Sequence, residues 1–104
     1  MNRRAKIPIP KVRLAKFCQK RHIVKMGLFG SILRDDFGPK SDVDVLVEFE
    51  PAHVPGLFGL AEMELELSKI MGRRKVDLNT PGFFGPDLRR QIVDDAEIVY
   101  AQIG

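Results

Sequence analysis

The sequence predicts an α/β or α+β fold, in which strands and helices alternate along a short chain. Four segments of up to eight residues are rich in Val, Ile, Leu and Phe, which favours strands. Three further segments space their apolar residues as amphipathic helices do. The length of 104 residues suits one hydrophobic core, and we find no internal repeat, low-complexity segment or second domain.

The first elements are expected to be a basic lead-in, a helix and a strand. Residues 1–10 contain two prolines and basic side chains, which favours an extended segment before a domain that spans residues 11–104. Residues 11–21 place apolar side chains near helical spacing among Lys and Arg, which predicts a short basic amphipathic helix. Residues 22–29, HIVKMGLF, are predicted to form the first strand.

The centre of the chain is expected to hold a turn, a short helix and a second strand. Gly30 and Ser31 end the first strand, and residues 31–37 are predicted to form a short helix. Residues 43–49, VDVLVEF, are predicted to form the second strand, which Pro51 follows.

The C-terminal half contains the clearest helix of the chain, over residues 57–71. Its apolar side chains share one face, Glu62 and Glu66 point away from that face, and Gly72 is the expected C-cap. The remaining expected elements are a strand over 74–79, a loop between Pro81-Gly82 and Gly85-Pro86, a helix over 87–95 and a strand over 97–101.

The composition, 44% hydrophobic and 30% charged, is that of a soluble globular protein. No apolar run is long enough to span a bilayer, and no secretion signal is recognised, so we expect a cytoplasmic protein without membrane association. The single Cys18 is interpreted as a buried helix residue. Nine of the 17 Lys and Arg residues lie in the first 25 positions, which contain no acid. This basic segment could meet nucleic acid, a triphosphate or an acidic partner, or could simply be a solvated face.

Two aspartates at the start of the second strand form the first candidate site. Because side chains alternate along a strand, Asp42 and Asp44 share the face opposite to Val43 and Val45. Paired carboxylates of this kind can bind Mg²⁺ together with phosphate oxygens. Taken alone, such a pair is more often two acids in an exposed strand entry than a metal site.

Three more residues extend this candidate site. Gly30 and Ser31 would let the backbone and a helix N-terminus approach phosphate, and Arg34 could add guanidinium donors. Asp77 interrupts the apolar strand KVDL and, if that strand lies beside residues 43–49, would bring a third carboxylate to the metal pair.

Other polar and aromatic residues are interpreted more simply. His22 and His53 lie in different segments and are expected to be structural or exposed. One of Phe83 and Phe84 is expected to anchor in the core and the other to remain available for contact. Arg73 and Arg74 could screen the carboxylates or cap the C-terminus of the 57–71 helix, where positive charge is favourable, and we favour the cap.

The combined pattern resembles the G-S-x-x-R and S-D-x-D-hydrophobic signature of the DNA polymerase β-like nucleotidyltransferases. It consists here of Gly30-Ser31, Arg34 and residues 41–47, SDVDVLV. The length, the RRKVDL strand and the ending DLRRQIVDDAEIVY are similar to those of the minimal nucleotidyltransferases, the MntA-like antitoxins encoded beside HEPN-domain toxins. The resemblance covers about residues 20–101 and implies a mixed sheet of about four strands packed against helices.

The resemblance also implies roles for residues. Asp42 and Asp44 would bind Mg²⁺ in a two-metal site, and Asp77 would be the third metal-binding and catalytic acid. The implied nucleotide-binding residues are Gly30, Ser31, Arg34 and Ser41. The implied reaction transfers a nucleotide, commonly AMP from ATP, to a hydroxyl of a partner protein, here a HEPN-domain toxin.

The sequence departs from the family after Gly-Ser, where Asp35 and Asp36 place negative charge close to the expected phosphate site. Two alternatives remain open. The chain could be an antitoxin that neutralises its partner by contact alone, or a nucleic-acid-associated domain that uses its basic segment, although nucleic acid is not expected to be the direct substrate. Because the chain lacks the second domain of larger relatives, a partner or a second copy is expected to complete the nucleotide pocket.

Overall fold

The computed structural model describes Ala5 and residues 7–102 of the chain. Within these residues the α-helices are α1 (Lys11–Lys20), α2 (Leu57–Ile70) and α3 (Pro86–Asp95). The strands are β1 (Ile23–Phe29), β2 (Val43–Phe49), β3 (Val76–Asn79) and β4 (Glu97–Ala101). Three 3₁₀ turns are η1 (Gly30–Leu33), η2 (Pro51–His53) and η3 (Pro81–Phe83). None of the described helices has the length and apolar character to cross a membrane.

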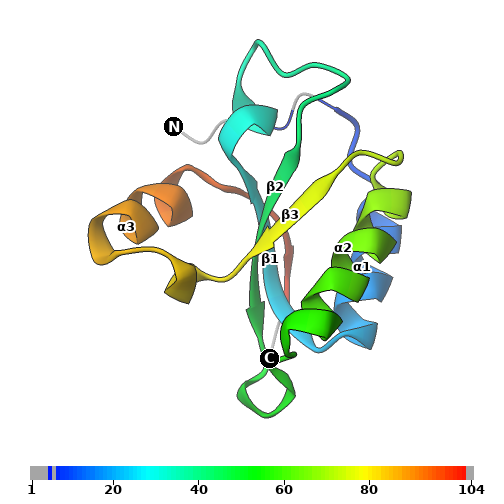
Figure 1. Ribbon diagram of the computed structural model, residues 1–104, viewed down its shortest axis with the longest axis vertical. Helices are drawn as coiled ribbons and strands as arrows, with labels where there is room; N and C mark the ends of the chain where they lie inside the picture. The colour runs from blue at the N-terminus through cyan, green and yellow to red at the C-terminus, as the bar shows by residue number, and fades with distance from the viewer. Residues whose placement is uncertain (1–4, 6, 103–104) are drawn as a thin grey trace.

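The strands form one mixed sheet in the order β3-β2-β1-β4. β1 is antiparallel to both β2 and β4, whereas β2 and β3 are parallel. The parallel pair needs a crossover, and α2 supplies it. Figure 1 shows α1 and α2 on one side of the sheet and α3 on the other. The predicted fold class is therefore confirmed.

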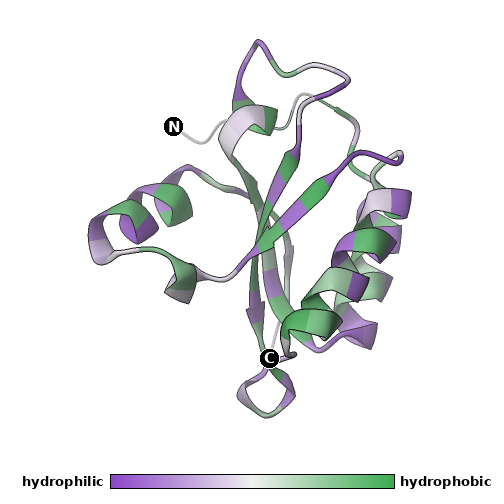
Figure 2. Ribbon diagram, viewed as in Figure 1, coloured by the Kyte–Doolittle hydropathy of each residue, from purple (hydrophilic) through white to green (hydrophobic). Residues whose placement is uncertain are grey.

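The core lies between the sheet and the helices α1 and α2. Val43, Val45 and Val47 on the inner face of β2 are at most 1% exposed, and they pack with Leu14 of α1 and Leu67 of α2 in one cluster. Figure 2 shows hydrophobic segments along the central strands and on α2. The opposite face of β2 is left for Asp44, Leu46 and Glu48, as the alternation predicts.

The end of α2 has the glycine cap that the sequence predicts. Gly72 has a φ of +77°, a left-handed conformation that costs glycine little. The backbone N–H of Arg73 donates to the carbonyl of Ser68 at 2.6 Å, which satisfies one of the last carbonyls of the helix.

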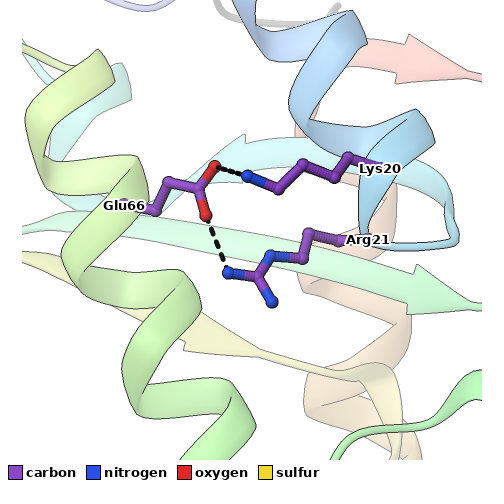
Figure 3. Close-up of polar contacts among 3 residues, drawn as sticks. All are labelled: Lys20, Arg21 and Glu66. Carbon is purple, nitrogen blue, oxygen red and sulfur yellow. Dashed lines mark hydrogen bonds and ion pairs between the residues drawn. The ribbon is translucent and has the colours of Figure 1, made fainter.

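Glu66 connects the two helices of the inner layer. Its carboxylate accepts hydrogen bonds from Lys20 Nζ and Arg21 Nη2, both at 2.8 Å (Figure 3). Glu66 lies off the apolar face of α2, as expected, and its side chain, 29% exposed, is directed toward α1. Sequence spacing places Glu66 off the apolar face of α2, but it carries no information about a basic neighbour 45 residues earlier.

The edge strand β3 is short and partly covered along its free side. The backbone N–H of Leu78 donates to Glu64 Oε2 of α2 at 2.8 Å, so the helix supplies a carboxylate where a further strand would pair.

The segment after β1 differs from the prediction. Instead of a helix over 31–37, the chain forms the four-residue 3₁₀ turn η1, and Arg34 returns to an extended conformation with ψ of 154°. The glycine-proline pair that follows and the cluster of acids leave too few residues for a longer helix to propagate.

Candidate active site

Three aspartates lie together on the outer face of the sheet, away from α1 and α2. β2 and β3 pair in parallel with Asp44 directly beside Asp77, so neighbouring strands carry the two acids side by side. Asp42 lies one residue before β2, on the same side as Asp44. The structure therefore brings together the three carboxylates that sequence reasoning singled out.

Asp44 is the least solvated of these three acids. Its pKa is raised above the ordinary value, first because burial disfavours the charged form, and then because Asp77 and Asp42 repel it. The backbone N–H of Ser31 and the charge of Arg34 act in the opposite direction. The raised pKa means that the negative charge on Asp44 is poorly compensated by the protein alone.

Gly30 is required at its position because Asp44 approaches the backbone there. Gly30 has a φ of +72°, a backbone conformation that residues other than glycine rarely adopt. In addition, a Cβ added at Gly30 would clash with Asp44 Oδ2. The glycine predicted to admit phosphate thus also makes room for an acid of the same site.

Two serines hold the segments around the acids. Ser31 Oγ donates to the backbone carbonyl of Asp42 at 3.1 Å, which ties η1 to the entry of β2. Ser41 Oγ accepts from the Gly38 N–H at 3.1 Å and so closes the loop before β2. Both serines therefore have structural contacts next to the carboxylates, beside the nucleotide contacts expected of them.

Basic side chains surround the acids loosely. Arg34 is exposed and acts on Asp44 only through its charge. Lys75 Nζ lies 3.9 Å from Asp42 Oδ2, with 75% of the Lys75 side chain exposed, so solvent screens this pair. Sequence reasoning missed Lys75, although its position two residues before Asp77 could have indicated it. Asp35 and Asp36 are also exposed, where repulsion of phosphate is screened.

Arg74 has a different partner from the one expected. Rather than capping α2, its Nη1 donates to the Gly38 carbonyl at 2.9 Å, and its guanidinium lies 4.8 Å from the centre of the Phe37 ring. Arg74 therefore fastens the loop that leads into Asp42, which is a contact between segments that spacing along the chain could not predict.

The two phenylalanines of the η3 loop differ in exposure, but neither belongs to the core cluster, so the expected core anchor is absent at both positions. Phe84 is half-buried and meets Phe29 edge-on, with ring centroids 6.1 Å apart, whereas Phe83 is 58% exposed. Because Phe29 pairs with Asp44 across the sheet, Phe84 lies close to the acids and Phe83 lies at the rim.

The donor set suits a hard divalent cation. It consists of carboxylate oxygens on one face, which Mg²⁺ prefers, and of one acid whose raised pKa reflects uncompensated negative charge. A cation there would remove the mutual repulsion of Asp42, Asp44 and Asp77.

Comparisons with known proteins agree with this geometry. A family model described as a nucleotidyltransferase domain matches residues 11–99. A relative from Methanocaldococcus jannaschii, which carries the provisional name protein adenylyltransferase MJ1379, is 34% identical over 77 residues, covering 73% of this chain and 76% of the relative. The structure of a provisionally identified minimal nucleotidyltransferase matches with a TM-score of 0.69 and 30% identity over 84% of this chain and 86% of that one.

A crystal structure of a toxin–antitoxin with AMP-PNP matches with a TM-score of 0.71, over 90% of this chain and 75% of that one. At 19% identity, this match establishes a shared fold alone.

Proposed function

The chain belongs to the nucleotidyltransferase domain family, and on that basis we propose that it is a protein adenylyltransferase that transfers AMP from ATP to a hydroxyl of a partner protein. The observation that carries the proposal is the side-by-side pair Asp44 and Asp77 on β2 and β3, with Asp42 on the same face. A relative that is 34% identical carries the name of this activity, which supports the same choice of reaction.

In this reaction the acceptor oxygen attacks the α-phosphorus of ATP, the bond to the bridging oxygen breaks, and pyrophosphate leaves. Asp77 is exposed and lies at the open side of the site, where it can accept the proton of the acceptor hydroxyl. Gly30 and Ser31 allow the phosphates to approach the backbone of η1 closely. Arg34, which follows η1, and Ser41, which precedes β2, would contact the phosphates.

Asp42, Asp44 and Asp77 would hold two Mg²⁺ ions, which when bound would neutralise phosphate charge in the transition state. The chain contributes the fixed positions of these carboxylates, because β2 and β3 are paired in register at Asp44 and Asp77.

We further propose that the partner is a HEPN-type ribonuclease toxin, which the modification silences. The support is the shared fold with a toxin–antitoxin that was crystallised with AMP-PNP. The partner toxin or a second copy of the chain would also cover the nucleotide, since the acids lie on the outer face of the sheet and Asp77 there is exposed.

A transfer assay tests the proposal. The purified chain is incubated with α-labelled ATP, Mg²⁺ and the protein encoded by the neighbouring gene, and label on protein is measured. The double variant Asp42→Asn/Asp44→Asn tests whether transfer of label requires the two carboxylates. Glu62→Gln, on the exposed face of α2, is the matched control.

Label that requires the two aspartates supports the proposal. Absence of label, with binding to the partner retained by both the native chain and the double variant, would show that the chain neutralises its partner by contact and would overturn the assignment as an enzyme.

A further inference from the structure

Two histidines and one glutamate meet at the end of the sheet opposite to the aspartates. His22 lies just before β1, Glu50 just after β2, and His53 ends the turn η2. The register places this end of the β1–β2 pair at Ile23 and Phe49, whereas the aspartates lie at the other end, where Phe29 pairs with Asp44. The cluster is therefore separate from the candidate active site.

The three side chains present their ligating atoms to one point. Those atoms all lie within 4.8 Å of one another. Glu50 Oε2 is 3.1 Å from Nδ1 of His53 and 3.5 Å from Nδ1 of His22. Ligands of a tetrahedral Zn²⁺ ion at its usual bond lengths are about 3.3 Å apart, so the two contacts to Glu50 bracket that spacing.

The backbone holds this arrangement before any ion binds. The Glu50 N–H donates to the His22 carbonyl at 2.9 Å, and the His53 N–H donates to the Glu50 carbonyl at 2.9 Å. The two imidazole rings are stacked, with centroids 3.7 Å apart and planes at 9°, so at least one ring must turn about χ2 before a single ion can lie in the plane of both. His22 adopts this position with a φ of +60°, a conformation that residues other than glycine take at a cost.

The surroundings leave room for further ligands. A cavity of about 210 Å³ adjoins the cluster and is lined in part by His22, Glu50 and Cys18. Between 39% and 46% of each of the three cluster side chains is exposed, so water can complete the coordination of an ion. Burial raises the pKa of the Cys18 thiol to about 12, and Cys18 does not belong to the group of residues whose ligating atoms converge.

We propose that His22, Glu50 and His53 bind one divalent transition-metal ion of the Zn²⁺ class, and that this ion clips the start of β1 to the turn that follows β2. Two imidazoles and one carboxylate are nitrogen-rich ligands that suit Zn²⁺, Ni²⁺ or Cu²⁺, whereas Mg²⁺ prefers oxygen alone. The ion is structural and stands apart from the nucleotide chemistry. The inference does not depend on the proposed adenylyl transfer.

Metal titration of the full chain tests the site. Binding of Zn²⁺ is measured by isothermal titration calorimetry in the presence of excess Mg²⁺, which is included to occupy the aspartates. In a parallel titration with Co²⁺, the visible ligand-field absorption of the bound ion is recorded. The cluster variants are Glu50→Gln, His53→Gln and His22→Asn, the last chosen because Asn tolerates a positive φ. Glu48→Gln, an exposed acid on the same strand, is the matched control.

We expect one Zn²⁺ per chain in the native protein and in Glu48→Gln, and binding at least tenfold weaker in each cluster variant. At a hundredfold excess over the Kd, Zn²⁺ should raise the Tm of the native chain on the order of 10 °C. The Asp42→Asn/Asp44→Asn variant should retain both effects.

Equal Zn²⁺ affinity in the native chain and the three cluster variants would overturn the proposal, as would loss of Zn²⁺ binding in the Asp42→Asn/Asp44→Asn variant. Should a cluster variant fail to fold, the Co²⁺ spectrum of the native chain decides alone: absorption without imidazole character would contradict ligation by His22 and His53.

Discussion

At the scale of single residues, the site combines three carboxylates whose negative charges repel one another with a glycine whose backbone Asp44 approaches closely. Asp44 is partly buried beside two other carboxylates, and this raises its pKa. A raised carboxyl pKa means that the folded state binds the proton more tightly than the unfolded state. Its stabilising contribution is therefore present below the unfolded pKa and is lost as the pH rises through the folded pKa. Without a cation, the site lowers stability at neutral pH.

Replacing Asp44 with Asn should raise the free energy of unfolding at pH 7 in the absence of metal, because the substitution removes a desolvated and repelled charge. The gain should disappear as the pH falls below the unfolded carboxyl pKa of about 3.9, where native Asp44 is neutral as well. Urea unfolding of both proteins at pH 7 and near pH 3.5 measures this.

The same measurement with Mg²⁺ reverses the order. Mg²⁺ should stabilise the native chain by mass action and leave Asp44→Asn nearly unchanged. A variant that is less stable than the native chain at pH 7 without metal would contradict the assignment of repulsion to Asp44.

Gly30→Ala should destabilise the chain by about 1–3 kcal/mol, because a Cβ at a φ of +72° is strained and would clash with Asp44 Oδ2. It should also reduce transfer by displacing that acid. Gly38→Ala is the matched control, since nothing lies within 4 Å of the Cβ that it would add. Thermal unfolding of both variants checks the difference, and equal losses would show that the contact with Asp44 is unimportant.

Sequence reasoning located the acids but not the reason for Gly30. Alternation along one strand is a local property, so Asp42 and Asp44 could be placed on one face from the sequence. Asp77 could join them only if its strand paired beside β2, and the structure supplies that pairing. The clash between Gly30 and Asp44 depends on how the turn η1 folds over β2. The meeting of His22 with His53 likewise depends on which strand ends are adjacent, and no spacing in the sequence reveals it.

At the scale of elements, helices α1 and α2 are joined by polar contacts as well as by the core. Lys20 and Arg21 both donate to Glu66, and these contacts lower the pKa of Glu66, with the Lys20 hydrogen bond as the largest cause. Arg21 Nε is buried without a hydrogen-bond partner among the described residues, so Arg21 depends on Glu66 for much of its compensation.

Glu66→Gln should lower the free energy of unfolding by about 1 kcal/mol at low ionic strength, and the loss should shrink in 1 M salt, where the Debye length is about 3 Å. Since the pKa of Glu66 is lowered, its contribution is present at neutral pH and is lost as the pH falls through the folded pKa.

Denaturant unfolding in low and high salt provides the measurement, with Glu62→Gln as the matched control because Glu62 is exposed on the same helix. A salt-independent loss at Glu66, or an equal loss at Glu62, would argue against the ion pairs.

The elements themselves could be predicted from the sequence because most depend on local periodicity. The three α-helices and four strands of the described residues all lie close to their expected ranges. The segment 31–37 is the exception, since its glycine and serine signal a turn but not its length. Contacts of Ser31 with Asp42 hold η1 against β2, and such a contact between segments cannot be inferred from propensity.

At the scale of the whole molecule, the two faces of the sheet have different roles. The inner face is sealed by α1 and α2 (Figure 1), while the outer face carries the aspartates and is covered in part by α3, none of whose residues is itself buried. An open face of this kind positions the acids but offers little enclosure for a nucleotide and an acceptor. Enclosure must come from another surface if water is to be excluded.

The isolated chain should therefore transfer AMP to a small acceptor such as a tyrosine amide at least about 10²-fold more slowly than to its protein partner, because the partner orients the acceptor. Rates with α-labelled ATP and each acceptor provide the comparison. Full activity toward the small acceptor, by a chain that light scattering shows to be monomeric, would contradict a shared pocket.

The hydrogen bond that Glu64 accepts from the backbone of β3 affects how readily this strand can pair with a strand of another molecule. β3 is an outer strand of only four residues, and outer strands are the places where sheets recruit foreign strands and grow into fibrils. Glu64 occupies the N–H of Leu78 that such growth would use. Asp77 lies on the same strand, next to Leu78. One helix carboxylate thus blocks a pairing position on the outer strand that carries the proposed catalytic acid, which disfavours pairing of this strand with a foreign one.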